Sequence, residues 1–254
     1  MINRGEFEER FDPYFYKEEL KKVVDAIKSF PNAKTLKDLK TYIKKGVFDM
    51  RPEKYTLAGI PFLRVADITF EGMNFSSTVF INDDTHQEEL NTEFFPGDIV
   101  IAKIGHTIGK VSILPNDYKK YNISQNVVGI RITEEAKEFI LSEYLRIFLS
   151  LKSGQLQVIR QSSHGAQPKI TLDALRKIII PIFSLSTQEE IIKKYYDGLN
   201  QKKQKEANAA ALLASIEGYL LQALGITLPP PSTQKKCFYT RAGKVSGGRV
   251  DPFY

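Results

Sequence analysis

The sequence predicts an α+β protein, in which a curved and mostly antiparallel sheet domain with peripheral helices is followed by one long coiled-coil helix. Residues 35–132 contain short apolar runs divided by Gly and Pro, a pattern typical of strands joined by turns. Residues 187–224 contain no Pro and carry apolar side chains at helical spacing. We therefore expect a sheet domain at 1–186, a helix at 187–225 and a linker at 226–254.

The domain is expected to begin with a helix at 17–30, which Pro31 ends. One face of this helix carries Leu20, Val23, Val24 and Ile27. The elements expected after it are strands at 60–65 and 78–81, a short helix at 83–90, strands at 99–104, 111–114 and 126–132, a helix at 139–151, and a last strand at 178–182. The helix at 139–151 is expected to turn Ile140, Tyr144, Ile147 and Leu151 inward.

Two of these strands are predicted to form a hairpin with a polar, basic tip. The turn FPGD at 95–98 leads into the first strand, and GHTIGK at 105–110 turns the chain back into the second. Asp98 lies before the strand at 99–104, where a carboxylate is typical of turn chemistry.

The long helix carries a heptad pattern. Ile192, Leu199, Glu206, Leu213 and Leu220 recur every seven residues, followed three residues later by Tyr195, Lys202, Ala209, Ile216 and Ala223. Thr187 is the expected N-cap, and Gly225 the expected stop. At 1.5 Å per residue the helix reaches roughly 55 Å, which exceeds one small domain, so part of its apolar stripe requires another helix as partner. The alternative is a surface helix packed on its own domain.

Composition narrows the function classes. The chain has 254 residues, of which 42% are hydrophobic and 26% charged, so it can bury a sizeable core. The first residues contain no apolar run typical of a signal peptide, and no stretch approaches the roughly 18 apolar residues of a membrane span. We therefore expect a cytoplasmic protein without a membrane partner. Cys237 is the sole cysteine, and the net charge of +6 favours a polyanionic partner.

The candidate catalytic motifs in the sequence do not meet their chemical requirements. The GHTIGK stretch at 105–110 lacks the spacing of a phosphate loop, and Val111 stands where that loop needs Ser or Thr. Asp98 and Lys103 lack the further clustered carboxylates of a magnesium-dependent nuclease. The three histidines have no near-neighbour ligand spacing, and no Gly-x-Ser-x-Gly elbow is present. We therefore expect no catalytic residue, no metal and no cofactor.

The loops carry residues suited to DNA. Long cations attract phosphates, whereas amide, hydroxyl and imidazole groups can hydrogen-bond to base edges. The predicted DNA-binding residues are Lys44, Lys45, Arg51, Lys54, Tyr55, Lys103, His106, Thr107, Lys110, Lys119, Lys120, Asn122, Gln125, Arg160, Gln161, Ser162, Ser163, His164, Gln167 and Lys169. The segment around His164 and Gly165 is the sharpest candidate. Its alternative is a solvated loop, since Ser, Gly and Gln are common in loops.

The two ends of the chain resemble each other. Residues 248–254 (GRVDPFY) match residues 9–16 (ERFDPYFY), which predicts that a second copy of the sequence begins at the end. A chance match is the alternative.

Five blocks, taken in order, carry a family resemblance. They are 59–68 (GIPFLRVADI) with Gly72, 95–105 (FPGDIVIAKIG), 109–110 (GK), 124–126 (SQN), and 178–182 followed by 188–191 (QEEI). Together they resemble a target recognition domain of a type I restriction-modification specificity subunit, over about residues 35 to 225. The chain departs from the pattern after Pro181, where Phe-Ser-Leu-Ser replaces a second Pro.

The resemblance implies a non-catalytic protein that names a DNA sequence for a multisubunit enzyme. Its partners would be double-stranded DNA, methyltransferase subunits that use S-adenosylmethionine, and restriction subunits that use ATP. Residues 1–186 would be the recognition domain, 187–225 the spacer helix, and 226–254 a linker and the start of a second repeat. Family members are similar in plan to two such halves, whose helices pair antiparallel.

We expect a homodimer through the long helix, reading an interrupted palindrome. Its predicted contacts are Ile192, Tyr195, Leu199, Leu213, Ile216 and Leu220. Two alternatives remain: an assembly protein that uses the helix without DNA, and the recognition region of a fused restriction-methylation enzyme.

Overall fold

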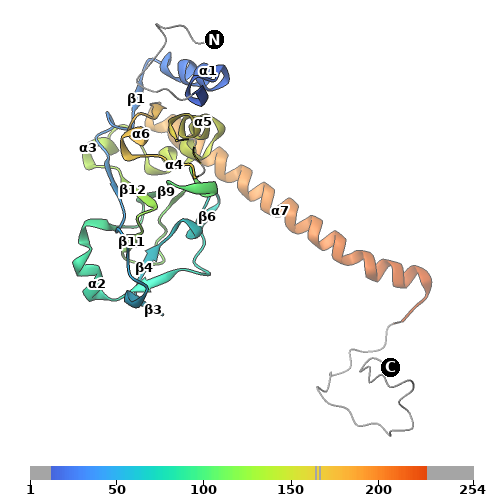
Figure 1. The fold of residues 1–254 in the computed structure, drawn as a ribbon. Helices are drawn as coiled ribbons and strands as arrows, with labels where there is room; N and C mark the ends of the chain where they lie inside the picture. The colour runs from blue at the N-terminus through green and yellow to red at the C-terminus, as the bar shows by residue number, and fades with distance from the viewer. Residues whose placement is uncertain (1–12, 164, 166, 228–254) are drawn as a thin grey trace. The chain divides into compact units, whose positions relative to one another are not determined.

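A computed structural model describes residues 13–163, 165 and 167–227 (Figure 1). The chain divides into two compact units, residues 1–198 and 199–254. The α+β class is confirmed, with antiparallel sheets, surrounding helices and a long C-terminal helix. Of the predicted repeat at the two ends, only residues 13–16 are described; the rest of it, and His164, lie outside the described residues.

The first unit begins with the 3-10 turn η2 (Pro13–Tyr16) and the helix α1 (Glu18–Lys28). Glu18 and Glu19 lie in the first turn of α1, where the helix dipole favours negative charge. Leu20 and Val24 are buried, and α1 packs against α5 and β13. The predicted helix is therefore confirmed to within two residues at each end.

A four-stranded sheet contains the predicted hairpin. Its strands are β2 (Tyr42–Lys45), β9 (Ile99–Ala102), β10 (Val111–Ile113) and β12 (Val127–Arg131), in the antiparallel order β10-β9-β12-β2. The hairpin pairs Val111 with Ile101. Asp98 accepts a hydrogen bond from the Phe95 backbone N–H at 2.8 Å and forms a 2.8 Å ion pair with Arg131. The carboxylate therefore stabilises the turn, as the sequence predicted.

The remaining strands form a second large sheet and two pairs. The second sheet has the order β3 (Tyr55–Thr56), β7 (Val79–Ile81), β4 (Ile60–Leu63), β11 (Tyr121–Ile123) and β8 (Glu93–Phe94). Its strands β4 and β11 run parallel, and its other pairs are antiparallel. The two-stranded pairs are β1 (Ala33–Thr35) with β13 (Ile179–Pro181), and β5 (Ile68–Thr69) with β6 (Gly72–Met73). The strands therefore form several sheets rather than one.

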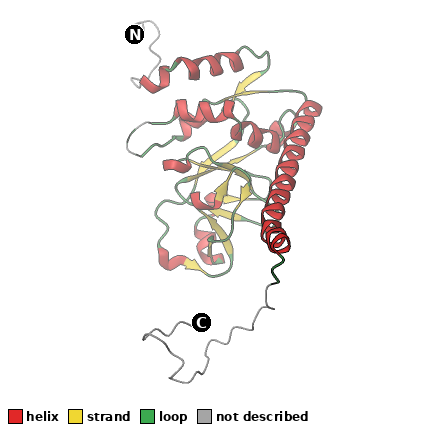
Figure 2. Ribbon diagram, turned by 90° about the vertical axis from the view of Figure 1, so that its right-hand side faces the viewer, coloured by secondary structure: helices red, strands yellow, loops and turns green. Residues whose placement is uncertain are grey.

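Helices surround these sheets in the first unit (Figure 2). The α-helices are α2 (Asp83–Glu88), α3 (Glu134–Lys137), α4 (Ser142–Ser150), α5 (Lys152–Gln161) and α6 (Leu172–Arg176). Further 3-10 turns are η3 (Pro52–Lys54), η4 (Val65–Asp67), η5 (Leu90–Thr92) and η6 (Gly105–Thr107). The helices α3, α5 and α6 were not predicted from the sequence.

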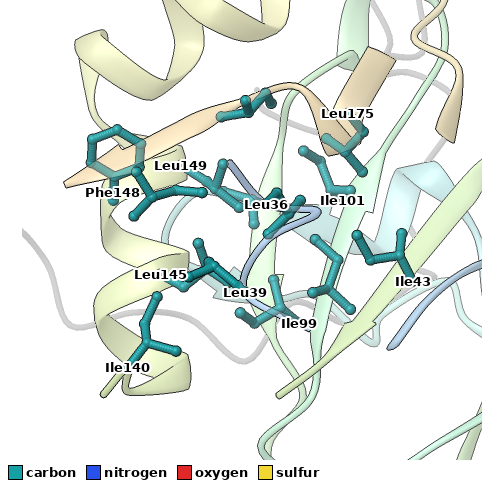
Figure 3. Packing of buried hydrophobic residues seen from close by; sticks show 14 of the residues in the cluster. Leu36, Leu39, Ile43, Ile99, Ile101, Ile140, Leu145, Phe148, Leu149 and Leu175 are labelled. Atoms are coloured by element: carbon teal, nitrogen blue, oxygen red, sulfur yellow. The ribbon is translucent and has the colours of Figure 1, made fainter. Parts of the chain in front are cut away.

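The main core lies between the four-stranded sheet and the helices (Figure 3). Ile99 and Ile101 on β9 belong to the same buried cluster as Leu145 and Leu149 on α4. Ile140, Tyr144 and Ile147 are buried as predicted. Leu151 is 45% exposed, so its predicted inward orientation is wrong. The cause is local: α4 ends at Ser150, and Leu151 has an extended backbone before α5 begins.

The long helix is α7 (Leu185–Leu224), orange in Figure 1. It begins two residues before Thr187, and the Ser184 hydroxyl accepts from the Thr187 N–H at 3.3 Å, so the predicted Thr187 N-cap is wrong. Gly225, with a φ of +66°, ends the helix as predicted. The two compact units meet after Gly198, later than the predicted boundary at 186, because the first turns of α7 pack on the sheet domain.

Candidate nucleic-acid interface

Three lysines from separate strands and loops gather at one place in the first unit. Lys103 follows β9, Lys45 ends β2, and Lys169 pairs with Ile104 in an isolated antiparallel bridge. The Lys103 N–H donates to the Asn126 carbonyl at 3.0 Å, and the Lys103 carbonyl accepts from the Ile170 N–H at 3.0 Å. The backbone therefore fixes Lys103 between two neighbouring segments. We call Lys45, Lys103 and Lys169 the lysine cluster.

The electrostatics of the lysine cluster suit an anion. Burial lowers the pKa of Lys103, and the positive charges of Lys45 and Lys169 lower it further. Within the described part of the chain, none of the three forms an ion pair with a carboxylate. Like charges held together without an acidic partner oppose folding, so an external anion would relieve their repulsion.

The hairpin tip lies against the end of the polar segment, whose described residues are 161–163, 165 and 167–169. The Gly105 N–H donates to the Pro168 carbonyl at 2.8 Å, and the Ser163 N–H donates to the Lys169 carbonyl at 2.8 Å. His106 is exposed in η6, and Lys110 is half-buried just beyond it. The structure thus brings together two stretches that are about 60 residues apart in the chain and that the sequence selected separately.

Three predicted base-reading residues serve the fold instead. Asn122 is fully buried: its amide donates to Thr92 Oγ1 at 2.9 Å and to the Glu89 carbonyl at 3.1 Å, and its Oδ1 lies 2.5 Å from His86 Nδ1. The Thr107 hydroxyl is buried and donates to the Ile104 carbonyl at 2.9 Å. The Ser162 hydroxyl is buried and donates to the Val158 carbonyl at 2.6 Å. Their prediction as DNA contacts is therefore wrong.

Arg160 is also a structural residue. The sequence placed it in a loop, but residues 152–161 form α5 and bury its side chain. Its Nε donates to the Phe15 carbonyl at 2.9 Å, and its guanidinium lies 3.8 Å from the centre of the Phe15 ring. Arg160 thus ties α5 to η2, and its prediction as a DNA contact is wrong. Gln161 lies in the last turn of α5 and is half-buried.

Two predicted lysines are compensated by acidic residues of α2. Lys54 pairs with Glu88, and Lys120 lies 3.2 Å from Asp83. Because these carboxylates neutralise them locally, the two lysines differ from the lysine cluster. The predicted positions that remain exposed or half-exposed are Lys44, Arg51, Tyr55, Lys119, Gln125, Ser163 and Gln167. Their roles stay predictions.

A cavity of about 280 Å³ lies beside the lysine cluster. Met50 and Tyr55 supply apolar surface to its lining, and Arg64, Gln125 and Asn126 supply polar groups. The sequence predicts Tyr55 and Gln125 as site residues but not Arg64, which lies in an apolar run typical of a strand. No group of three or more His, Cys, Asp or Glu suited to a metal occurs among the residues that the structure covers, and no helix among them is long and apolar enough to span a membrane.

Comparisons with known proteins agree with one another. The family model described as "Type I restriction modification DNA specificity domain" matches residues 32–209. The chain is 26% identical over 136 residues to the type I restriction enzyme EcoBI specificity subunit of Escherichia coli, covering 54% of this chain and 28% of that protein.

Two solved structures share the fold. One, described as showing the complex assembly and conformational transition of the type I R-M system, superposes with a TM-score of 0.54 at 18% identity, covering 81% of this chain and 50% of its own. The HsdS subunit from Thermoanaerobacter tengcongensis gives a TM-score of 0.50 at 16% identity, covering 75% and 45%. The chain thus spans half or less of the length of these relatives.

Proposed function

Because the chain belongs to the type I restriction modification DNA specificity domain family, we propose that it binds double-stranded DNA and selects the sequence on which a methyltransferase acts. The family resemblance found in the sequence is confirmed by the match over residues 32–209. The observation that carries the proposal is the lysine cluster, which is held by backbone hydrogen bonds and lacks acidic partners among the described residues. Phosphate oxygens would supply the missing negative charge.

The division of labour among the loops follows from their chemistry. The lysine cluster neutralises phosphates and sets the position of the domain on the duplex, a contact that carries no sequence information. Gln125, Ser163 and Gln167 are exposed or half-exposed near the cluster or in the polar segment, and their groups can hydrogen-bond to base edges. Sequence choice therefore rests on the polar residues and affinity rests on the cations.

The chain itself supplies binding rather than catalysis. The catalytic motifs tested in the sequence do not meet their residue requirements, and the E. coli relative is a specificity subunit. Methyltransferase and restriction subunits would supply the chemistry, bringing S-adenosylmethionine and ATP. The solved relative described as showing the assembly of the type I R-M system is the support for such partners.

Two copies of the chain pair through α7. The second part of this helix exposes large apolar side chains, with Leu213 at 69% and Leu220 at 54%. Exposed apolar surface of this kind marks an association site, and the seven-residue spacing is that of helix pairing. A two-fold dimer with antiparallel helices would present two identical recognition domains in opposite orientations. Its DNA site would be an interrupted palindrome.

Salt dependence of binding tests the DNA proposal. For a protein that grips phosphates, the logarithm of the binding constant falls linearly with the logarithm of salt concentration, by about 0.9 per phosphate contact. Replacing Lys45, Lys103 and Lys169 with Ala should flatten this slope by up to about 2.7. The matched control is the Lys54→Ala and Lys120→Ala pair, whose charges are already compensated.

An assembly protein that does not bind DNA is the second candidate, and the exposed apolar seam of α7 favours it. Such a protein would associate through α7 with no salt-dependent affinity for DNA. If the affinity of the wild-type chain for every duplex is independent of salt concentration, the DNA proposal is wrong and the assembly protein takes its place.

A further inference from the structure

The cavity beside the lysine cluster is built by two tightly joined backbone segments. Gly46 donates to the Val127 carbonyl at 3.1 Å, and Val47 donates to the Ile123 carbonyl at 2.9 Å. A Cβ at Gly46 would lie 1.9 Å from the Ile123 carbonyl oxygen, so only glycine permits this approach. The lysine cluster adjoins the same segments, because Lys45 precedes Gly46 and the Lys103 N–H donates to the Asn126 carbonyl. A duplex held by the cluster would lie next to the cavity.

The lining of the cavity has the chemistry of a nucleobase site. Its apolar part includes Met50 and Tyr55, and its polar part includes Gln125 and Asn126, whose amides can both donate and accept. Pockets that hold a base combine apolar or aromatic surfaces with hydrogen bonds to the base edge. The volume, about 280 Å³, lies just below the roughly 300 to 1,000 Å³ range of drug-sized ligands and suits a small planar ring.

Arg64 has a hydrogen-bond donor that the described fold does not use. One terminal nitrogen of its guanidinium donates to the Ser77 carbonyl at 2.5 Å. Its Nε is buried and has no acceptor among the residues that the structure describes. A buried donor without a partner costs about 1 to 3 kcal/mol and is rare in folded proteins, so the described fold alone does not account for the placement of this side chain.

A phosphate is a poorer occupant than a base. The carboxylate of Asp49 and the apolar groups of Met50 and Tyr55 line the same cavity. A phosphate group would lose its hydration against the apolar part of the cavity. The carboxylate would also repel its negative charge. A neutral base carrying hydrogen-bond acceptors meets neither objection.

Phe48 lies between two residues that line the cavity. Its side chain is 77% exposed, while its neighbours Val47 and Asp49 both belong to the lining. Asp49 has a φ of +54°, a left-handed conformation that is uncommon outside glycine. Apolar side chains exposed beside cations are used by DNA-binding proteins as wedges between base steps.

We infer that this cavity receives one base of the bound DNA, rotated out of the helical stack, with Phe48 inserted in the space that the base leaves. The inference rests on the proposed DNA binding. Extruding a base costs a few kcal/mol of stacking and pairing. Contacts with Arg64, Gln125 and Asn126 inside the cavity would offset that cost, and the base that fits best would be preferred. Arg64 and Phe48 would thus determine specificity at that one position.

Fluorescent base analogues test the inference with the full chain. Once the recognition site is known, 2-aminopurine or pyrrolocytosine is placed in turn at every adenine or cytosine of both strands, so that each base pair is sampled. Both analogues brighten when they leave the stack. We expect a rise of several-fold at one base pair of each half-site on saturation with the wild-type chain. Phe48→Ala should remove most of that rise, whereas Leu57→Ala, a fully exposed apolar residue outside the cavity, should leave it intact.

The outcomes separate this inference from the proposed function. Salt-dependent binding of the wild-type chain with no rise at any position overturns the extruded base and leaves DNA recognition standing. If the wild-type chain binds no duplex at all, both the extruded base and the proposed DNA recognition are overturned. Binding of free adenosine at micromolar concentration, without a DNA signal, would assign the cavity to a free nucleoside and overturn the inference.

Discussion

The first and second parts of α7 share one seven-residue spacing but have different surroundings. In residues 185–198, Gln188 is fully buried and its side chain accepts from the Leu141 N–H and donates to the Phe139 and Phe183 carbonyls. Ile191 and Ile192 pack against the main core. In residues 199–224, all side chains are exposed except Leu199 and Leu221, which are half-buried. One continuous helix thus contains a part fixed to its domain and a part with an open apolar seam.

The difference shows what a heptad pattern can and cannot indicate. The spacing predicts that a helix has an apolar seam, but it does not identify the partner of that seam. For the first part, the partner is the sheet domain, so the alternative of a surface helix packed on its own domain is correct there. For the second part, no partner occurs among the described residues. Substitutions in the two parts should therefore affect different measurements.

The largest effect is expected where the first part of α7 meets the domain. Arg146 is buried, forms an ion pair with Glu143, and donates to the Tyr195 and Tyr196 hydroxyls at 3.0 and 3.2 Å. Arg146→Ala leaves the half-buried Glu143 without its cation, which should lower the free energy of unfolding by about 3 to 5 kcal/mol. Urea unfolding followed by circular dichroism measures this loss.

The control for Arg146, which lies on α4, is an exposed cation on the first part of α7. Lys193→Ala should change the free energy of unfolding by less than about 0.5 kcal/mol. Equal losses in the two variants would mean that the buried network does not hold α7 on the domain.

The second largest effect concerns association. Leu213 is exposed in the single chain, so Leu213→Ala should leave the unfolding of the sheet domain unchanged. If the side chain is buried between two helices, the same change should weaken the dimer by about 2 to 5 kcal/mol. Sedimentation equilibrium over a range of concentrations measures the dissociation constant. An unaltered constant in the Leu199, Leu213 and Leu220 triple variant would exclude this seam as the interface.

The smallest effect is expected at an exposed ion pair of the second part. Lys202 and Glu206 lie 3.7 Å apart, and both side chains are more than half exposed. Glu206→Gln should change domain stability by no more than about 0.5 kcal/mol, because solvent screens such pairs. In an antiparallel dimer, however, Glu206 faces Lys202 and Lys203 of the partner, so the dimer should become less sensitive to salt. A dimer with the same salt dependence in both proteins would disprove that register.

Local patterns were sufficient for much of the fold. The hairpin at 99–114 was predicted because its turn residues and apolar strands are adjacent in the chain. Helix α5 was missed because two of its buried residues are polar. Gln157 hydrogen-bonds both the N–H and the carbonyl of Ile179, and Arg160 stacks on Phe15, so the buried face lacks an apolar period.

Local sequence patterns also do not show which residues of the candidate DNA interface come together. Composition selected Lys45, Lys103 and Lys169, but their approach depends on long-range hydrogen bonds such as that between Gly105 and Pro168. Asn122 was assigned to DNA because its buried partner, His86, is 36 residues away. A polar residue in a loop-like context cannot be separated from a buried one until its partners are known.

The sequence of the recognised DNA tests the central claim most directly, namely that the open seam of α7 pairs two copies of this chain. Methylated positions would be mapped in DNA from cells that express the chain with the methyltransferase subunit proposed as its partner. A dimer paired through α7 should give two identical half-sites in inverted orientation, separated by a gap of fixed length. A methylated site whose two halves are unrelated in sequence would contradict it.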